Sequence, residues 1–356
     1  MFDSVDALMR SAVADGAFPG CALAIGLRER SLLTACYGRL GSPDSPAVTP
    51  ETRYDLASLT KIVAPTMLAL RALEDGKLAL ADTLSQFFDA PADKRDITIF
   101  NLMTHTSGME PSFLLEENAL DPRDALRAIL ARKLLYPVGK RAEYSCMGYI
   151  TLGKILEKCY GLPLDEAAKR YVFAPLGMTA TGYLPSGDNI APTEIDAATG
   201  EPWQGIVHDE NARFQNGVSA NAGVFSNIMD LSRFAGMLAC GGRCDGTTFL
   251  ARDTLRLAAS DHTPGMPLAR GLGFELAARG VTFFGDLWPR EGFGHTGFTG
   301  TSMAIDPRSG LYAVLLSNRV YPTRENMKLT RVRKLLHNLI YATYQRECCD
   351  EKESNV

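Results

Sequence analysis

The chain has 356 residues, of which 46% are hydrophobic and 22% are charged, and its formal net charge is −4. This length and composition are typical of a globular protein with one large domain or two closely packed ones. The charge balance and the lack of a Lys/Arg run argue against a nucleic-acid partner. No apolar stretch is long enough to span a bilayer, so no membrane partner is expected either.

The N-terminus and the cysteines indicate the compartment. The first residues predict an amphipathic helix with acidic side chains, without the basic and apolar regions of a secretory signal. A cytoplasmic protein is therefore expected. The eight cysteines are scattered and show no metal-binding spacing, so we expect reduced thiols. Cys240 with Cys244 is the one pair whose spacing suggests a disulfide.

The first part of the chain predicts a helix, a hairpin and a loop. Residues 3–15 have helical periodicity. Residues 22–25 and 32–38 have the composition of two strands joined by a short turn. A loop rich in Pro and Ser follows at 41–50.

The next segment contains Ser58 and Lys61, the only serine and lysine in the chain that are three residues apart in that order. On a helix this spacing places both side chains on one face, one turn apart. A lysine whose pKa is lowered can take the proton of a serine nucleophile. Pro65, inside the apolar run 62–73, predicts a kink or a tightened N-terminal turn. The alternative is an ordinary buried helix in which the pair is incidental.

The remainder of the chain returns from helices to strands. From about 77 to 215 the pattern is helical with long loops, and later strands precede a closing helix. The expected elements are helices at 123–135 and 147–160, strands at 271–284, 299–306 and 311–317, a helix from about 325 to 345, and a flexible polar tail at 347–356.

Strands at both ends with helices between them predict an α/β (α+β) fold. We expect a sheet subdomain from 1–76 and 216–346, and a mainly helical subdomain inserted at 77–215. The cleft between these two parts is the expected site.

Two further segments supply candidate partners for Ser58. Tyr144 stands at the entrance of the 147–160 helix, where nearby cations would favour its phenolate. The stretch 294–300, Gly-His-Thr-Gly-Phe-Thr-Gly, opens the late strands with small residues that let a ligand approach the backbone. The alternatives are a tyrosine packed on its own helix and a simple glycine-rich turn.

These three motifs, in this order, resemble the serine β-lactamase and penicillin-binding-protein superfamily, and most closely its class C-like branch with related esterases and D-aminopeptidases. The resemblance covers roughly residues 15–345. It implies an antiparallel sheet flanked by helices. Supporting stretches lie at 101–108, from 148 onward, at 175–178 and at 222–226.

The resemblance implies an acyl-enzyme route without a metal or cofactor. Ser58 would attack a carbonyl, and Lys61 and Tyr144 would share the proton transfers. The backbone N–H groups of Ser58 and Phe298 would hold the oxyanion. His295, Thr296 and Gly297 would line the strand side and meet a carboxylate or polar group. His105 is expected to order its loop.

Cys146 differs from the family motif, which has asparagine at this position. A thiol replaces the amide's donor and acceptor only weakly, so weak or no β-lactamase activity is expected. Cys146 as an alternative nucleophile lacks an obvious histidine base. The loop 208–211 predicts either a pocket wall or a loop that holds itself together.

The leading hypothesis is a serine hydrolase that acts on a small ester, amide or peptide, of the carboxylesterase or D-amino-acid/cell-wall-peptide peptidase type. The alternative is a non-catalytic protein that uses the same fold for binding or assembly. The loss of asparagine favours the alternative, and the retention of Ser58, Lys61 and Tyr144 argues against it.

Overall fold

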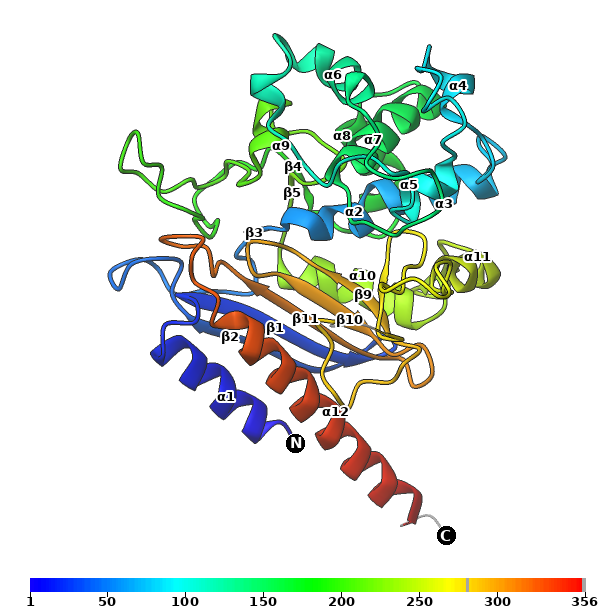
Figure 1. Cartoon of the computed structure of the whole chain (residues 1–356). Helices are drawn as coiled ribbons and strands as arrows, with labels where there is room; N and C mark the ends of the chain where they lie inside the picture. Colours follow the sequence, from blue (N-terminus) through cyan, green and yellow to red (C-terminus); the bar gives the residue numbers. More distant parts are fainter. Residues whose placement is uncertain (280–281, 354–356) are drawn as a thin grey trace.

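Six antiparallel strands from the two ends of the chain form the central sheet, in the order β2-β1-β11-β10-β9-β8 (Figure 1). The computed structural model describes residues 1–279 and 282–353, with side chains up to Glu347. The predicted assembly of one sheet from both chain ends is confirmed. The strands are β1 (Gly20–Leu27), β2 (Arg30–Gly38), β8 (Glu275–Leu276), β9 (Phe293–Thr296), β10 (Ser302–Ile305) and β11 (Leu311–Ser317).

The N-terminal hairpin is joined to the C-terminal strands through β1 and β11. Leu23 lies opposite Leu315 in this pairing, and every residue of β11 is buried. A continuous apolar run suits a strand that is covered on both faces, as the sequence predicted for 311–317.

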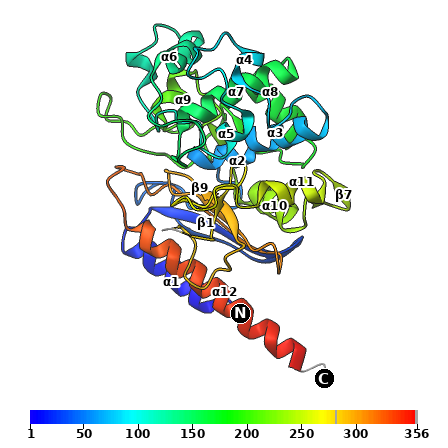
Figure 2. The ribbon, with the colours of Figure 1, turned by 45° about the vertical axis from the view of Figure 1, so that its right-hand side comes forward.

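Helices cover both faces of the sheet. The terminal helices α1 (Asp3–Ala14) and α12 (Leu329–Glu353) lie side by side on one face (Figures 1 and 2). On the other face α10 (Ile228–Ala239) packs against β1 and β11. Apolar side chains of α1, α12 and the sheet form a separate core cluster on the first of these faces.

A group of short helices lies beyond the other face, at the top of Figure 1, with α7 (Cys146–Tyr160) in contact with its neighbours α3, α5, α6 and α8. This arrangement accords with the predicted subdomains, whose boundaries stay a prediction. The other helices are α2 (Thr60–Val63), α3 (Pro65–Glu74), α4 (Leu84–Phe87), α5 (Ile99–Met103), α6 (Ala125–Ala131), α8 (Leu164–Ala168), α9 (Glu210–Phe214) and α11 (Arg252–Ala258).

The remaining elements are short. Strands β3 (Tyr54–Asp55), β4 (Gly182–Tyr183) and β5 (Val224–Ser226) form a three-stranded sheet in the order β3-β5-β4. Strands β6 (Arg243–Cys244) and β7 (Thr247–Thr248) form a hairpin. The short tight turns are the 3-10 helices Ala57–Leu59, Leu115–Glu117 and Pro122–Asp124 and the π-helical turn Lys169–Phe173.

Several predicted elements are shorter in the structure. Of the predicted strand 271–284 only β8 forms, since Gly273 has a left-handed φ of 86°, and residues 280–281 lie outside the described part. The strand predicted from 299 begins at Ser302, because the chain turns between Gly297 and Thr301. The helix predicted at 123–135 is α6, which ends where Arg132 becomes extended.

At the C-terminus, α12 begins at Leu329 and continues to Glu353, so the predicted tail at 347–356 is helical in its first part. Residues 354–356 lie outside the described part. No described helix is both long enough and apolar enough to cross a membrane. The six described cysteines are free, which includes Cys240 and Cys244.

Candidate active site

Ser58 lies in a strained turn between β3 and α2. Ala57, the residue before it, has a φ of 46°, a conformation that costs a non-glycine residue about 1 kcal/mol or more. The buried carboxylate of Asp55 accepts the Ala57 N–H at 2.8 Å and the His208 N–H at 2.7 Å. Asp55 therefore ties the Ser58 turn to the loop at 208. Pro65 was predicted to cause a kink or a tightened N-terminal turn; in the structure α2 ends at Val63, α3 begins at Pro65, and a 3-10 turn precedes α2.

Lys61 is fully buried next to Ser58. Its Nζ lies 3.1 Å from Ser58 Oγ, 3.6 Å from Cys146 Sγ and 2.8 Å from the Asn221 carbonyl oxygen. These three acceptors match the three N–H groups of an ammonium. Burial disfavours the charge, but Cys146 and Tyr144 favour it, and the pKa of Lys61 is raised. The sequence argument asked for a lowered pKa, so the resting lysine does not have the form of a free base.

Tyr144 completes the group that the sequence proposed as catalytic. The centre of its ring lies 4.8 Å from Lys61 Nζ and 4.6 Å from the ring of His105. Its buried hydroxyl has no hydrogen bond of normal geometry to any residue that the structure describes. The pKa of Tyr144 is raised, because burial outweighs the lowering effect of the nearby Lys61 charge and Ser58 hydroxyl. The resting side chain is therefore the phenol, in contrast to the phenolate that the sequence argument expected. The hydroxyl is thus close to both groups and free for a substrate.

A cavity of about 380 Å³ opens beside Ser58. Six of the eight predicted site residues line it: Ser58, Tyr144, His295, Thr296, Gly297 and Phe298. Lys61 and Cys146 lie behind this wall, in contact with each other. Four charged residues that the sequence reasoning missed also line the cavity: Arg270, Glu275, Arg319 and Arg333.

A family model named Beta-lactamase matches residues 5–338. The chain belongs to this family. The Escherichia coli K12 protein named "Putative D-alanyl-D-alanine carboxypeptidase" is 30% identical over 304 residues, which span 76% of this chain and 70% of that protein. The Bacillus subtilis strain 168 protein named N-acetylmuramyl-L-alanine amidase is 29% identical over 354 residues, 88% of this chain and 80% of that one.

Solved structures share the fold of this beta-lactamase family member. EstCE1, described as a hydrolase with promiscuous acyltransferase activity, superposes with a TM-score of 0.77 at 23% identity, covering 95% of this chain and 97% of that one. The octameric penicillin-binding protein homologue from Pyrococcus abyssi superposes with a TM-score of 0.74 at 20% identity, covering 94% and 77%. These likenesses show the shared fold, and the family match with the 30% identical relative makes the chain a serine hydrolase of the beta-lactamase superfamily.

Two buried histidines surround Tyr144 in this family member. The Ser145 N–H donates to His105 Nδ1 at 3.1 Å, which fits the ordering role expected for His105. His295 Nδ1 lies 2.7 Å from the Thr296 carbonyl oxygen, so it carries the proton, and Nε2 is a buried acceptor. Burial, Lys61 and Arg270 lower the pKa of His295 to about 3. His295 therefore offers an acceptor to the cavity and no positive charge.

Gly297 is required where the end of β9 meets the Ser58 turn. A Cβ at this position would lie 2.1 Å from Thr301 Oγ1 and 2.2 Å from the Leu56 carbonyl oxygen. Thr301 donates to that carbonyl oxygen at 2.9 Å, and Thr299 donates to the Asp55 carbonyl oxygen at 2.7 Å. Gly297 therefore admits the chain's own backbone on one side and lines the cavity on the other, so its approach by a ligand stays a prediction.

The loop 208–211 supports the site from behind. Asp209 Oδ1 accepts hydrogen bonds from the Ala212 N–H and the Asn221 side chain, and the Asn221 carbonyl oxygen holds Lys61. The His208 ring stacks on Phe298 at 5.7 Å, and its Nε2 lies 3.2 Å from Glu194. Of the two readings of this loop, the hydrogen bonds favour the one that holds itself together.

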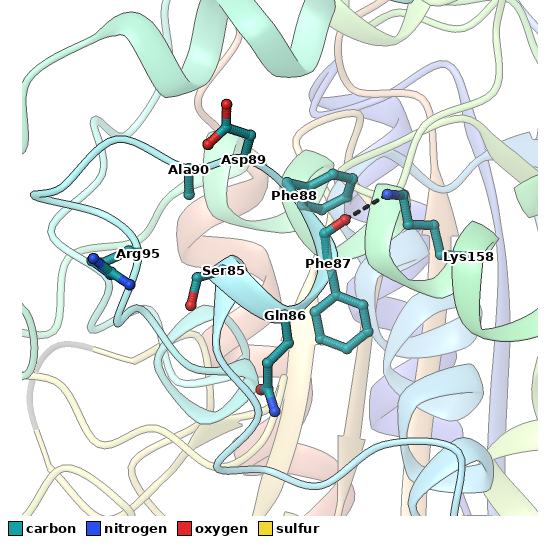
Figure 3. Close-up of a pocket in the computed structure, with 8 residues that line it drawn as sticks. All are labelled: Ser85, Gln86, Phe87, Phe88, Asp89, Ala90, Arg95 and Lys158. Atoms are coloured by element: carbon teal, nitrogen blue, oxygen red, sulfur yellow. Dashed lines mark hydrogen bonds between the residues drawn. The ribbon is translucent and has the colours of Figure 1, made fainter.

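A larger cavity of about 570 Å³ lies between α4 and α7 (Figure 3). Its wall includes Ser85, Gln86, Asp89 and Lys158, and Figure 3 shows Lys158 pointing at the Phe87 carbonyl oxygen, to which it donates. None of the predicted site residues lines it. Volume alone would therefore select a cavity that contains none of the predicted site residues.

Proposed function

We propose that the protein hydrolyses a small ester or amide through an acyl-enzyme on Ser58. The contact of 3.1 Å between Ser58 Oγ and Lys61 Nζ, at the wall of a cavity, carries this proposal. A nucleophile with an adjacent proton-transfer group, itself held by a third group, is the arrangement that covalent catalysis needs. Here the third group is Asn221, whose carbonyl oxygen fixes Lys61.

The proton path follows from the hydrogen bonds of Lys61. The three N–H groups of the Lys61 ammonium are already hydrogen-bonded, so Lys61 does not take the Ser58 proton. Tyr144 first gives its own proton to the solvent, and the adjacent Lys61 charge stabilises the phenolate that results. The phenolate oxygen then takes the proton of Ser58. Ser58 Oγ then bonds to the substrate carbonyl carbon. The developing oxyanion faces the backbone N–H groups of Ser58 and Phe298.

Collapse of the tetrahedral intermediate breaks the bond to the leaving group. The alcohol or amine departs with the proton held by the Tyr144–Lys61 pair. A water molecule then gives a proton to the same pair and attacks the acyl carbon, which releases the acid and restores the Ser58 hydroxyl. The two half-reactions use the same groups in opposite directions, as a shared acid and base allows.

Esters are the substrates that the site supports best. Cys146 faces Lys61 where an asparagine would donate to a substrate amide, and a thiol does this weakly. We therefore propose weak or no β-lactamase activity. The names of the relatives, a carboxypeptidase and an amidase, support a D-amino-acid or cell-wall peptide as the second candidate substrate.

The test is labelling of the intact protein by a fluorophosphonate, and separately by a penicillin, followed by mass spectrometry. We expect one fluorophosphonate adduct on the wild type and none on Ser58→Ala, whose melting temperature should be unchanged. Ser85→Ala, in the larger cavity, is the matched control and should be labelled like the wild type. A folded wild type that neither reagent labels and that turns over no ester would favour the binding or assembly reading.

A further inference from the structure

His208 makes one contact with each half of the expected oxyanion site. Its backbone N–H donates to Asp55 Oδ2 at 2.7 Å, and the other oxygen of Asp55 accepts the N–H of Ala57, the residue before Ser58. Its ring stacks on Phe298, with 5.7 Å between the ring centres and 23° between the ring planes. One buried residue is therefore linked to both Ser58 and Phe298, whose N–H groups are proposed to hold the oxyanion.

The backbone of Phe298 is fixed on both sides, whereas its side chain is half exposed. The Gly297 N–H donates to the Thr301 carbonyl oxygen at 2.8 Å. The Thr299 hydroxyl donates to the Asp55 carbonyl oxygen at 2.7 Å. The Phe298 ring itself is 49% exposed and lines the cavity. Its orientation therefore depends on the side chains that contact it.

His208 and Arg319 contact the Phe298 ring, and both are buried, at 3% and 7% exposure. The Arg319 guanidinium carbon lies 4.6 Å from the centre of the ring. Its Nη1 donates to the carbonyl oxygens of Arg324 and Asn326 at 2.8 Å, which fixes the guanidinium. The rotamers open to a side chain depend on its backbone angles, so holding the Phe298 ring also restrains the Phe298 N–H.

Glu194 fixes the ring of His208 from the other side of the loop contact. Glu194 Oε2 lies 3.2 Å from His208 Nε2, and a carboxylate only accepts, so this nitrogen carries the proton. Arg324 donates to both oxygens of Glu194, from its backbone N–H at 3.0 Å and from Nε at 2.6 Å. Burial and the Arg324 charge outweigh the nearby carboxylates and lower the pKa of His208. The ring is thus a neutral group that is held against Phe298.

We propose that His208 is a positioning residue for the oxyanion site. Its ring holds Phe298 and its N–H holds the Ser58 turn through Asp55, so that both backbone N–H groups point at the developing oxyanion. This inference rests on the proposed function of Ser58. A misplaced donor loses much of its effect, because a hydrogen bond weakens steeply as its angle departs from linear. The described wall of the cavity does not include His208, so His208 acts through the residues that it holds.

The test compares phenyl acetate with its thionoester, O-phenyl ethanethioate, in which sulfur replaces the carbonyl oxygen. Sulfur is a weak hydrogen-bond acceptor, so the oxyanion N–H groups favour the ester. The ratio of the two kcat/KM values therefore reports on oxyanion binding, and a loss of folded protein cancels from it. We expect the ratio to fall by about 10-fold in His208→Ala. Deleting an oxyanion donor costs about 10²- to 10³-fold, and here the donors remain but are misplaced.

A double-variant cycle shows whether His208 acts through Phe298. Phe298→Ala removes the other ring of the stack and should lower the ratio by a similar factor, and the double variant should lose no more than either single variant. His262→Ala is the matched control and should keep the wild-type ratio, because His262 contacts the Phe100 ring outside the cavity wall. If His208→Ala does not fold, it is replaced by His208→Gln, whose amide can still donate to Glu194, and the same fall is expected.

Failure of this role is distinguishable from failure of the proposed function. An unchanged ratio in His208→Ala, or losses that add in the double variant, would overturn the role of His208 alone. If Ser58 takes the fluorophosphonate but neither compound is hydrolysed, the rate of labelling replaces kcat/KM, because the P=O oxygen would occupy the oxyanion site. That rate should fall by about 10-fold in His208→Ala, and an unchanged rate contradicts the proposal. A wild type that is neither labelled nor active rejects the proposed function, and this inference with it.

Discussion

The cavity beside Ser58 and the cavity beside α4 differ in a way that their volumes do not show. The larger one, of about 570 Å³, is lined by exposed side chains such as Ser85 and Asp89, and its Lys158 donates to a backbone carbonyl oxygen. The smaller one, of about 380 Å³, has buried polar atoms of Tyr144, Arg270 and His295 without partners in the described structure. Water satisfies an exposed polar group at little cost, whereas a buried unpaired group is expensive.

The lysines of the two cavities differ in their burial, and therefore in the strength of their electrostatic interactions. Charges interact more strongly where water is excluded, so Lys61, buried and bonded to three acceptors, acts on Ser58 far more than an exposed lysine would. Lys158 is exposed and lies 4.4 Å over the ring of Phe88, where it serves packing. This difference indicates that an active site is better recognised by buried charged groups with fixed hydrogen bonds than by the volume of its cavity.

The largest difference in kcat should appear when Lys61 and Lys158 are each replaced by methionine. Lys61→Met keeps the length of the side chain but removes the charge, and we expect kcat for an ester to fall by about 10²- to 10⁴-fold, the contribution typical of a positioned proton-transfer group. Lys158→Met should leave kcat within about twofold, because a surface charge away from the site contributes little. Steady-state kinetics on both purified variants measure the ratio.

The comparison breaks if the two variants lose activity equally. Equal losses of kcat would mean that Lys61→Met lowers activity by destabilising the folded protein. Its melting temperature, measured by circular dichroism, would then fall as well. An intact fold with a selective loss in kcat would assign the effect to proton transfer.

Local spacing explains why part of the site could be predicted. Ser58 and Lys61 are three residues apart, so the turn alone brings them together, and the apolar run 62–73 made the helix evident. The two strand-rich ends predicted one sheet built from both, and the pairing of β1 with β11 within it was learned from the structure. Tyr144 and the stretch 294–300 were candidate partners from their residues, and the resemblance gave them their roles.

Long-range packing explains what the sequence could not predict. Arg270 and Arg333 line the same cavity although 62 residues separate them in the sequence. Asp55 has no motif of its own, and its role depends on a loop that begins 153 residues later. No local pattern encodes such a contact, although an arginine in an otherwise strand-like or helix-closing segment is a signal worth testing.

A smaller effect is expected from Asp55, which is buried, in contrast to the exposed Asp89 of the larger cavity. Burial raises the pKa of Asp55 to about 6, against the lowering effect of its bonds from His208 and Ala57. Ionised Asp55 holds both N–H groups, so kcat should decline as the pH falls through about 6. Asp55→Asn should lower kcat by about 10-fold, because an amide oxygen accepts only one of the bonds well and misplaces Ser58, and should flatten this acid limb.

The free energy of unfolding should change with pH in the direction opposite to kcat, because of the same titration of Asp55. Its folded pKa lies above the ordinary value of 3.8, so the folded state binds more protons between about pH 4 and 6, and this group reduces stability as the pH rises through that window. The full effect is about 3 kcal/mol by linkage. Chemical denaturation at several pH values measures it, and Asp89→Asn is the control. An acid limb that persists in Asp55→Asn would assign the titration to another group.

The smallest effect concerns Cys146, which contacts Lys61 at the start of α7, whereas Cys159 near the other end of the same helix does not. In Cys146→Asn the amide oxygen would accept from Lys61 and the amide N–H would donate to a substrate carbonyl oxygen. One added neutral hydrogen bond corresponds to about 2- to 10-fold, so acylation of Ser58 by a penicillin should quicken by that factor while ester turnover stays the same. Cys159→Asn should change neither rate. Because a thiol and an amide differ mainly in hydrogen bonding, an equal rise for ester and penicillin would show that Cys146 limits access to Ser58 and has no part in recognising amides.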